Sequence, residues 1–462
     1  MFNGDPKVAQ EDLKRYAAVT PQDVTQTFAR YITGQPAVVL SVVPMGASEM
    51  AAKPADFPPP ETLLENTAQL QDPAVPATET DTLPQPREVH DSFDRNIRPR
   101  PGINPVVQLP PIHDGKLANG VRMLSVKNDE TPTVTMRLVF DMGQRDEPPG
   151  KAGLAGLTAN LMNEATTERS AAEFSEALER IGANVDVSSG QYQTTLDLDT
   201  LATHLEPAMA LVMERLLKPA FTAEDFDRIK SQTLESLRAA QKSGPALAGR
   251  AMSAALAGPT HPLSYPASGL PSTVESLTLD DVKAFYAAHI PSHLNGVLVS
   301  TSVPQEEIDR AVQDLGQLPV ARNKRENIDG LITTKGRTIF LVDKPGSTQS
   351  SVRIGHPSLA YDAVGEYYRA NLMNFALGGS FDSRINLNLR EDKGWTYGAY
   401  TGFNGGQEFG SFQFSGEINS EATGVAIAET LEELEKYSTA GMTETEFRYM
   451  QSSIGQSDAM LY

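Results

Sequence analysis

The sequence predicts an α+β fold built from repeated units. Within residues 111–320, short apolar strands come first, long amphipathic helices follow, and one further strand returns near the end. That order is typical of an antiparallel-rich sheet whose helices cover one face. From residue 330 the same order of strands and helices begins again. We interpret the recurrence as a weak internal repeat of about 200 residues.

Composition limits the classes of function. The chain has 462 residues, enough for roughly two to four domains. It carries 59 acidic and 39 basic residues, a formal net charge of −20, which argues against a nucleic-acid partner because phosphates require clustered Lys and Arg. There is no cysteine, so disulfides, thiolate zinc sites and cysteine nucleophiles are excluded. No apolar run of about 18 residues occurs, so we expect no membrane span.

Residues 1–45 predict the end of a domain. A helical pattern at 7–16 is followed by a second helix, which Thr20 caps and Pro21 begins. The β-branched run 37–43 predicts a buried strand. Because no further core follows, we interpret this segment as the tail of a preceding domain. The chain also stops inside a helical pattern, so we expect a fragment.

Residues 46–110 predict an extended linker. Proline recurs among Ala, Thr, Asp and Glu, and such a segment buries too little apolar surface to offset its conformational entropy. An ordered strap over residues 93–101 is an equally good interpretation of its last part.

Residues 111–325 predict one complete unit. Asn119-Gly120 indicates a hairpin turn. Ser170 with Glu173 three positions later indicates a capping box, and Gly182 suits the end of the same helix. The expected strands lie at 121–126, 134–140, 185–187, 194–198 and 296–302. The expected helices lie at 151–163, 170–181, 201–217, 223–242, 245–256, 279–289 and 304–315.

Residues 326–462 predict a second unit of the same kind, which we expect to be truncated at its end. Strands are expected at 337–342, 350–355, 395–400 and 410–416, and helices at 364–377 and 422–437. Its most distinctive stretch is 377–400, which opens with Gly378-Gly379, continues as an amphipathic helix carrying Arg384 and Arg390, and leaves as an aromatic strand with Tyr397. A cation at a helix end and a phenol on the next strand can both reach one cleft.

The chain resembles the insulinase/pitrilysin family of zinc metallopeptidases, which includes the processing peptidases. The resemblance covers nearly everything outside the linker. It depends on an ordered set of motifs: GLAG at 153–156, RSAAEF at 169–174, LERIGA at 178–183, His261-Pro262, YAAHIPSHLNGVL at 286–298, LGG at 377–379, Ser383-Arg384 and LREDKGWTY at 389–397. The resemblance implies repeated domains of the type seen in LuxS and mitochondrial processing peptidase, with two halves closing around an extended peptide.

The zinc motif of that family is absent at the matching positions. The family carries H-x-x-E-H on a helix, with two His ligands and a Glu that activates water. Here residues 156–160 read Gly, Leu, Thr, Ala, Asn. Glu235 falls near the place of the third ligand, but a lone carboxylate makes no zinc site, and a solvated helix residue is its ordinary interpretation. We therefore predict no metal site in this chain.

The histidines do not replace the missing motif. His289 and His293 are separated by Pro291, which prevents a regular helical pair. The remaining histidines are spread along the chain as His90, His113, His204, His261 and His356.

The resemblance assigns roles to the 377–400 stretch. It implies that Arg390 and Tyr397 hold the substrate carbonyl, where guanidinium and phenol donors stabilise growing negative charge. It also suggests Gly378, Gly379 and Arg384 as substrate-binding residues. From the residues alone, the ordinary interpretation is a surface ion pair for Arg390 and a strand-core position for Tyr397. Gly378-Gly379 is equally compatible with a helix end.

Two functions follow. The first is the substrate-binding half of a zinc endopeptidase, inactive alone and paired with an H-x-x-E-H half in the same polypeptide or in a separate subunit. Its partners would be that half, which supplies the zinc, and an extended peptide. The alternative is a non-catalytic structural or peptide-binding subunit of the same family. Bacterial members are often periplasmic, and the resemblance favours that compartment.

Overall fold

The computed structural model describes residues 14–43, 47–52, 94, 97, 102–103, 106–258, 261–322, 324–325 and 336–458. Contacts group residues 1–99 and residues 100–462 into two units, each of which is described by itself. Most of the predicted linker, including nearly all of the predicted strap at 93–101, lies outside the described residues.

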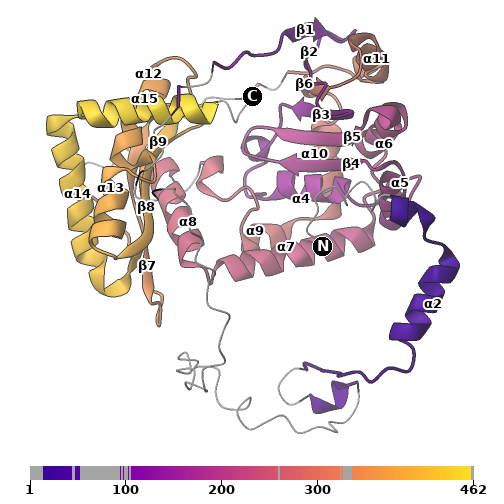
Figure 1. Cartoon of the computed structure of the whole chain (residues 1–462), viewed down its shortest axis with the longest axis horizontal. Coiled ribbons are helices and arrows are strands. Elements are labelled where there is room, and N and C mark those ends of the chain that lie inside the picture. The colour runs from indigo at the N-terminus through magenta and orange to yellow at the C-terminus, as the bar shows by residue number, and fades with distance from the viewer. Residues whose placement is uncertain are drawn as a thin grey trace. The chain divides into compact units, whose positions relative to one another are not determined.

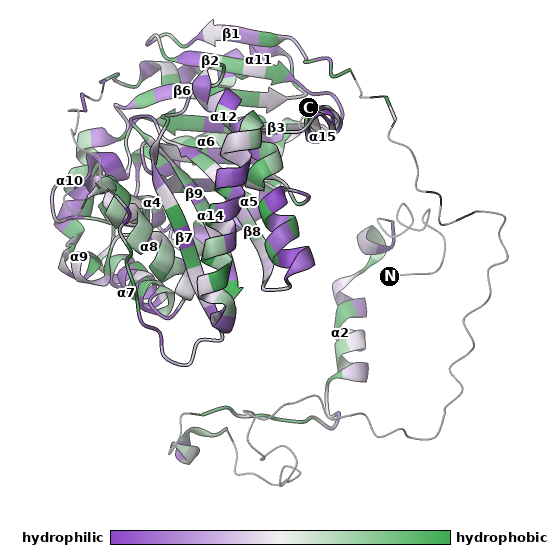
Figure 2. Cartoon of the chain, turned by 90° about the vertical axis from the view of Figure 1, so that its left-hand side faces the viewer, coloured by the Kyte–Doolittle hydropathy of each residue, from purple (hydrophilic) through white to green (hydrophobic). Residues whose placement is uncertain are grey.

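The first unit contains α2 (Pro21–Tyr31) and the short 3₁₀ turn η1 (Ser48–Met50). As predicted, Thr20 caps α2: its hydroxyl accepts from the backbone N–H of Asp23 at 3.2 Å, and the Asp23 carboxylate accepts from the backbone N–H of Thr20 at 2.9 Å. The predicted buried strand at 37–43 is wrong for this structure, because these residues pair with no strand in the described part of the unit and residues 37–42 are exposed. Figure 2 shows the mixture of apolar and polar residues along α2.

The second unit contains a six-stranded sheet in the order β1-β2-β6-β3-β5-β4 (Figure 1). The β2–β6 pair is parallel and the other pairs are antiparallel. Asn119-Gly120 forms the predicted turn between β1 and β2, with Gly120 at a φ of 87°. The strands are β1 (Ile112–Lys116), β2 (Arg122–Lys127), β3 (Thr133–Phe140), β4 (Asn184–Ser189), β5 (Thr194–Leu201) and β6 (Leu294–Thr301).

Helices cover one face of this sheet. In β3, Met136 and Leu138 are buried and alternate with exposed Thr135 and Arg137, so one face holds the core and the other meets solvent. The helices are α4 (Leu154–Met162), α5 (Ala171–Ile181), α6 (Leu205–Leu217), α7 (Ala223–Ala240), α8 (Gly244–Ala257), α9 (Pro271–Ser276), α10 (Leu279–His289) and α11 (Gln305–Ala311), with 3₁₀ turns η3 (Gln144–Asp146), η4 (Ala202–His204), η5 (Pro262–Ser264) and η6 (Gln313–Gln317). None of the helices in the described ranges is long and apolar enough to span a bilayer.

A three-stranded antiparallel sheet follows, in the order β7-β9-β8. Its strands are β7 (Gln349–Ser358), β8 (Thr396–Gly405) and β9 (Gly410–Asn419), and its helices are α12 (Glu366–Asn374), η7 (Phe375–Gly379), α13 (Arg384–Asn386), η8 (Leu387–Asp392), η9 (Ser420–Ala422), α14 (Thr423–Ala440) and α15 (Glu444–Asp458). Ile385, Leu389, Phe414 and Ile418 form the centre of its core. The α+β class is confirmed.

The structure corrects two predictions in this region. Residues 337–342 form no strand, because no strand of the described chain pairs with them and their side chains are exposed. The helix expected to carry both Arg384 and Arg390 is a single α-turn, α13, that continues as the π-helix η8. The helix expected to end at residue 377 likewise ends as the π-helix η7.

The turn between β8 and β9 contacts the loops of the six-stranded domain within the second unit. Glu408 accepts hydrogen bonds from the Arg145 guanidinium, Nε to Oε2 and Nη2 to Oε1, both at 2.9 Å. Phe409 lies edge-on to His261, with 5.3 Å between ring centroids. An arginine and a turn far apart in the sequence thereby fix one sheet to the other.

Candidate functional site

The helix α4 occupies the place of the missing zinc motif. Leu157, Thr158 and Ala159 are buried, and the Thr158 hydroxyl donates to the Leu154 carbonyl at 2.8 Å. Asn160 is exposed. The helix is therefore held by ordinary packing, and glycine, alanine and an amide at the three matching positions do not fit a zinc ion.

Other possible metal ligands do not gather at α4. Glu235 is exposed on α7. In the described part of the chain, no group of three or more His, Asp or Glu side chains is placed to hold a metal ion. The His289 and His293 rings lie 5.1 Å apart, but α10 ends at His289, and His293 Nδ1 bonds to the His289 carbonyl at 2.9 Å.

Glu147 supports the start of α4. Its carboxylate accepts from the backbone N–H groups of Gly153 at 3.1 Å and Ala155 at 2.8 Å. Burial nevertheless raises the pKa of Glu147 to about 8, against an ordinary value of 4.5. Glu147 was not among the predicted site residues. The signal that could have indicated it is its position six residues before Gly153, which precedes the first residue of α4.

Four consecutive elements of the three-stranded domain carry all the predicted site residues. Gly378 and Gly379 lie in η7, Arg384 in α13, Arg390 in η8 and Tyr397 in β8. Two of these elements are π-helices, which are rare and frequently occur at functional sites. The structure thus places the five residues in one region, although they differ in what their side chains contact.

Gly378 and Gly379 pack against neighbouring backbone. A Cβ at Gly378 would lie 2.2 Å from the Thr401 hydroxyl and 2.6 Å from its backbone nitrogen, and a Cβ at Gly379 would lie 3.0 Å from the Asn374 carbonyl. Absence of a side chain lets η7 approach β8 closely. This packing explains both glycines without a ligand.

Arg384 is engaged within the chain. Its Nε and Nη2 donate to the Glu446 carboxylate at 2.6 and 2.7 Å, and Nη2 also donates to the Gly441 carbonyl at 2.9 Å. The guanidinium also stacks 4.8 Å from the centre of the Tyr437 ring. A peptide could use this guanidinium only after these contacts opened.

Arg390 is less fully engaged. Its guanidinium lies over the Phe381 ring at 4.3 Å, and its Nη1 lies 3.3 Å from the Glu391 carboxylate. Among the described residues, that buried Nη1 has no hydrogen-bond partner. The buried Nη1 of Arg390 therefore has an ion-pair partner in Glu391 but makes no hydrogen bond within the described chain, and such a group calls for an explanation.

Tyr397 points away from the core. Its side chain is 91% exposed, so the strand-core interpretation is wrong. The register between β8 and β9 shifts between Thr396 and Ala399, which places Tyr397 at a β-bulge. Bulges re-aim side chains and are frequent beside active sites. β8 is also an edge strand, so its outer side is unpaired within the described chain.

Buried amides hold this region together. Asn386 accepts from the Ala399 backbone N–H at 3.0 Å, and the Asn374 side chain exchanges hydrogen bonds with Thr401 at 2.6 and 2.8 Å. The backbone N–H of Trp395 donates to the Leu389 carbonyl at 3.0 Å. These bonds join α12 and α13 to β8 and η8 to the residue before β8, and they set where Arg390 and Tyr397 lie. Neither asparagine was predicted from the sequence. The signal that could have indicated them is a polar residue inside each apolar helical run.

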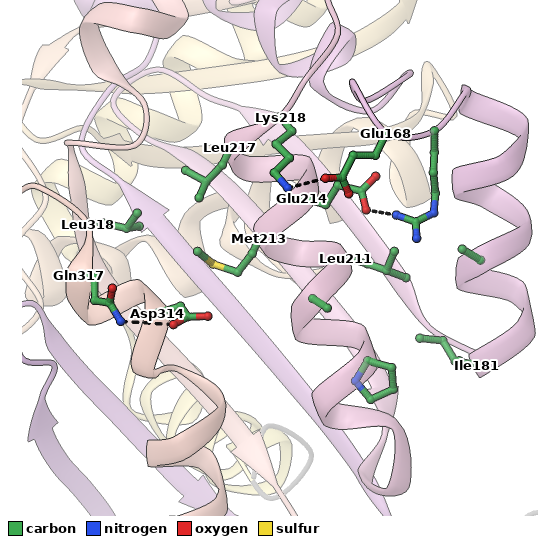
Figure 3. Close-up of a pocket in the computed structure, with 14 residues that line it drawn as sticks. Glu168, Ile181, Leu211, Met213, Glu214, Leu217, Lys218, Asp314, Gln317 and Leu318 are labelled. Atoms are coloured by element: carbon green, nitrogen blue, oxygen red, sulfur yellow. Dashed lines mark hydrogen bonds and ion pairs between the residues drawn. The ribbon is translucent and has the colours of Figure 1, made fainter.

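A separate groove of about 790 Å³ lies between α5, α6 and η6 (Figure 3). Apolar side chains such as Leu211 and Met213 line it, with the ion pair of Lys218 and Glu168 at one end. It contains none of the predicted site residues, so the concavity and the candidate site are different places in the molecule.

Comparison with known proteins gives consistent matches. The family model described as insulinase (peptidase family M16) matches residues 122–264, and the model described as peptidase M16 inactive domain matches residues 276–454. The non-peptidase homolog YmxG of Helicobacter pylori is 26% identical over 331 residues, covering 71% of this chain and 75% of that protein. An uncharacterized zinc protease of Streptomyces coelicolor is 24% identical over 341 residues, covering 71% and 72%.

Solved structures share the fold. A peptidase M16 inactive domain from Pseudomonas fluorescens superposes with a TM-score of 0.68 at 24% identity, covering 75% of this chain and 84% of that chain. A protease from Helicobacter pylori superposes with a TM-score of 0.67 at 21% identity, covering 77% and 86%. The two family models, which match successive parts of the second unit, show that this chain belongs to the insulinase family, peptidase family M16.

Proposed function

We propose that this chain is the substrate-binding half of a zinc-dependent endopeptidase and that it works with an H-x-x-E-H half of the same family. The observation that carries the proposal is the pair formed by Arg390 and Tyr397. One offers a buried N–H without a hydrogen-bond partner in the described chain, and the other an exposed phenol at a bulge. Because positions 156, 159 and 160 of α4 carry no zinc ligand, the proposal places the metal chemistry in the other half.

In this proposal, the chain contributes hydrogen-bond donors to the reaction. Zinc in the partner half would supply the Lewis acid and the activated water. Arg390 and Tyr397 would donate to the peptide carbonyl oxygen, whose negative charge grows as the carbon is attacked. A fixed donor is worth more in the transition state than in the bound substrate, so its removal lowers turnover.

The test uses a quenched fluorescent peptide library and the chain mixed with H-x-x-E-H members of its own genome. We expect hydrolysis only in the mixture, and we expect a chelator to abolish it. Arg390→Ala and Tyr397→Phe should each lower turnover more than tenfold without changing assembly, which size-exclusion chromatography checks. Tyr400→Phe, on the same strand and partly exposed, is the matched control. Unchanged turnover in both variants would refute the assigned roles.

A second candidate, a non-catalytic subunit that holds peptides or partners, is favoured by two observations. The residues at positions 156, 159 and 160 fit no zinc, and the relative from Helicobacter pylori is named a non-peptidase homolog. Under this function, a well-folded mixture binds peptide but shows no chelator-sensitive hydrolysis with any family partner.

A further inference from the structure

The outer edge of β4 is occupied by side chains of the chain itself. In the described chain β4 pairs only with β5, so the N–H and C=O groups of alternate residues point away from the sheet. At Val187 both groups are bonded, because the Asn163 amide donates to the carbonyl at 2.8 Å and accepts from the N–H at 2.9 Å. At Val185 the carbonyl accepts from the Arg215 guanidinium. An added strand would need these same backbone groups.

The two side chains that close β4 are held in place. Asn163 is the residue at which α4 ends. Arg215 is 5% exposed, its guanidinium lies 4.2 Å from the centre of the Phe174 ring, and its Nη2 donates to the Asn163 carbonyl at 3.0 Å. An incoming strand would therefore have to displace a buried cation as well as an amide.

The outer edge of β8 is closed in the same way. No strand of the described chain pairs with this side of β8, but side chains bond its backbone. Asn386 accepts from the Ala399 N–H at 3.0 Å, and Asn374 donates to the Thr401 carbonyl at 2.8 Å. The first two outward-facing residues after the bulge thus have internal partners.

The Tyr367 hydroxyl extends this closed stretch of β8. It donates to the Phe403 carbonyl at 2.9 Å and accepts from the Gly405 N–H at 3.3 Å. Every second residue from 399 to 405 therefore uses a backbone group within the chain. Tyr397 precedes this stretch, so its exposed phenol lies beside a closed edge.

The same arrangement occurs at the same place in both domains. β4 and β8 end the corresponding strand orders β3-β5-β4 and β7-β9-β8. The helix that follows β3 is α4, and the helix that follows β7 is α12. Each ends at an asparagine, Asn163 or Asn374, whose side chain bonds to the end strand. The closed edge is thus a feature of the repeat and not of one loop.

A closed edge limits how the chain recognises a peptide. In strand addition, the N–H and C=O groups of a peptide pair with the free backbone groups of a sheet edge. Those groups are taken along β4 and β8. In the proposed function, Arg390 and Tyr397 donate to a peptide carbonyl, and this contact requires no N–H from the peptide.

We propose that this chain recognises an extended peptide through its carbonyl oxygens and not by strand addition at β4 or β8. The inference rests on the proposed function and names a substrate class. Peptides that lack backbone N–H groups, such as those with proline or N-methylated residues at alternate positions, bind this chain as well as ordinary peptides do. Proline and N-methylated residues weaken strand addition because neither can donate to a ladder of backbone bonds.

Binding of N-methylated peptides to this chain tests the inference. The probe is a fluorescent peptide with the sequence of a library member that the mixture hydrolyses, N-methylated at its odd residues in one series and at its even residues in the other. Strand addition uses the N–H groups of one series only. We expect all three dissociation constants, measured by fluorescence anisotropy, to agree within threefold.

The outcomes separate the inference from the proposed function. A larger loss of binding in one methylated series would show strand addition and overturn the inference, while leaving the peptide-binding function standing. If the mixture hydrolyses no library peptide and no unmethylated peptide binds this chain, the proposed function fails, and the closed edge is then decided by hydrogen exchange.

Hydrogen exchange tests the closed edge without a peptide. Asn163→Ala removes the acceptor of the Val187 N–H, so we expect that amide to exchange at least tenfold faster. Asn160→Ala, exposed on the same helix, is the matched control and should leave the rate unchanged. Amides of β3, which lies between β5 and β6, report unfolding of the whole domain and should keep their rates. An unchanged Val187 amide, or an equal increase in β3, would show that Asn163 does not close the edge.

Discussion

The ion pair of Arg145 and Glu408 should couple the two sheets of the second unit energetically. The Arg145 side chain is 7% exposed and that of Glu408 is 25% exposed. Removing one partner of a buried ion pair weakens the compensation of the other charge and costs about 3–5 kcal/mol. Because Glu408 retains some solvent, we expect the lower end, about 3 kcal/mol, for Glu408→Ala.

The single tryptophan of the chain provides the assay. Trp395 packs against the core of the three-stranded domain, so its fluorescence reports the unfolding of that domain in urea. With a slope of about 3 kcal/mol per M urea, a loss of about 3 kcal/mol lowers the midpoint by about 1 M. A double-mutant cycle with Arg145→Met then isolates the coupling between the two side chains.

The cycle has a clear refuting result. We expect a coupling energy of at least about 2 kcal/mol, well above the 0.2–1 kcal/mol of an exposed pair. A coupling below about 0.5 kcal/mol would show that water screens Arg145 and that the β8–β9 turn does not hold the sheets together. The exposed pair of Arg448 and Glu444 on α15 is the control cycle and should fall in the weak range.

Three further predictions concern single residues. Arg384 holds the pKa of Glu446 at about 2 through hydrogen bonds. Because this folded pKa is below 4.5, the stabilisation exists above pH 4.5 and is lost toward pH 2. Arg384→Met should therefore flatten the fall of the melting temperature with acid that thermal melts show. Glu147 has a folded pKa of about 8, so its contribution to the free energy of unfolding is complete below pH 4.5 and falls by about 4 kcal/mol as pH rises to 8. Glu147→Gln should remove this decline, which urea titrations at several pH values measure. Gly378→Ala would place a methyl group against Thr401 and should cost about 1–3 kcal/mol, seen as a fall of several degrees in the melting temperature.

Each of these predictions has a control within the chain. A Cβ at Gly156 meets only the Ala267 carbonyl, at 3.4 Å, so Gly156→Ala should leave the melting temperature nearly unchanged. An equal loss in this variant and Gly378→Ala would contradict the packing argument. The Arg384 variant should retain the loss of stability above neutral pH, and the Glu147 variant should retain the acid decline. If each variant lost the decline assigned to the other, or if both had the same pH profile, groups other than Glu446 and Glu147 would dominate the pH dependence of stability.

Local signals explain why much of the fold could be predicted. The bounds of α10 follow from Thr278 at its start and from the apolar period behind it, and they agree with the structure. The capping box of Ser170 and the glycine after Ile181 likewise mark the two ends of α5. Such signals lie within a few residues of the feature they specify, so a single sequence contains them.

The parts that could not be predicted depend on distant partners. The π-turns η7 and η8 continue an ordinary helical pattern. Bonds between Asn374 and Thr401 and between Asn386 and Ala399 hold the preceding helices α12 and α13 against β8. The pair of Arg145 and Glu408 joins residues 263 positions apart. For the candidate site, the residues alone favoured an ordinary interpretation of Arg390, and only the family resemblance selected it. The exposure of Tyr397 came from a bulge that no local pattern announced.

The packing of α4 also has an evolutionary consequence. Leu157 and Ala159 face the core, whereas Asn160 faces solvent and Gly156 has room for a methyl group. Once no metal must be held, selection acts on this helix only through its packed side. Among close relatives of this chain, positions 156 and 160 should therefore vary freely while positions 157 and 159 stay small or apolar.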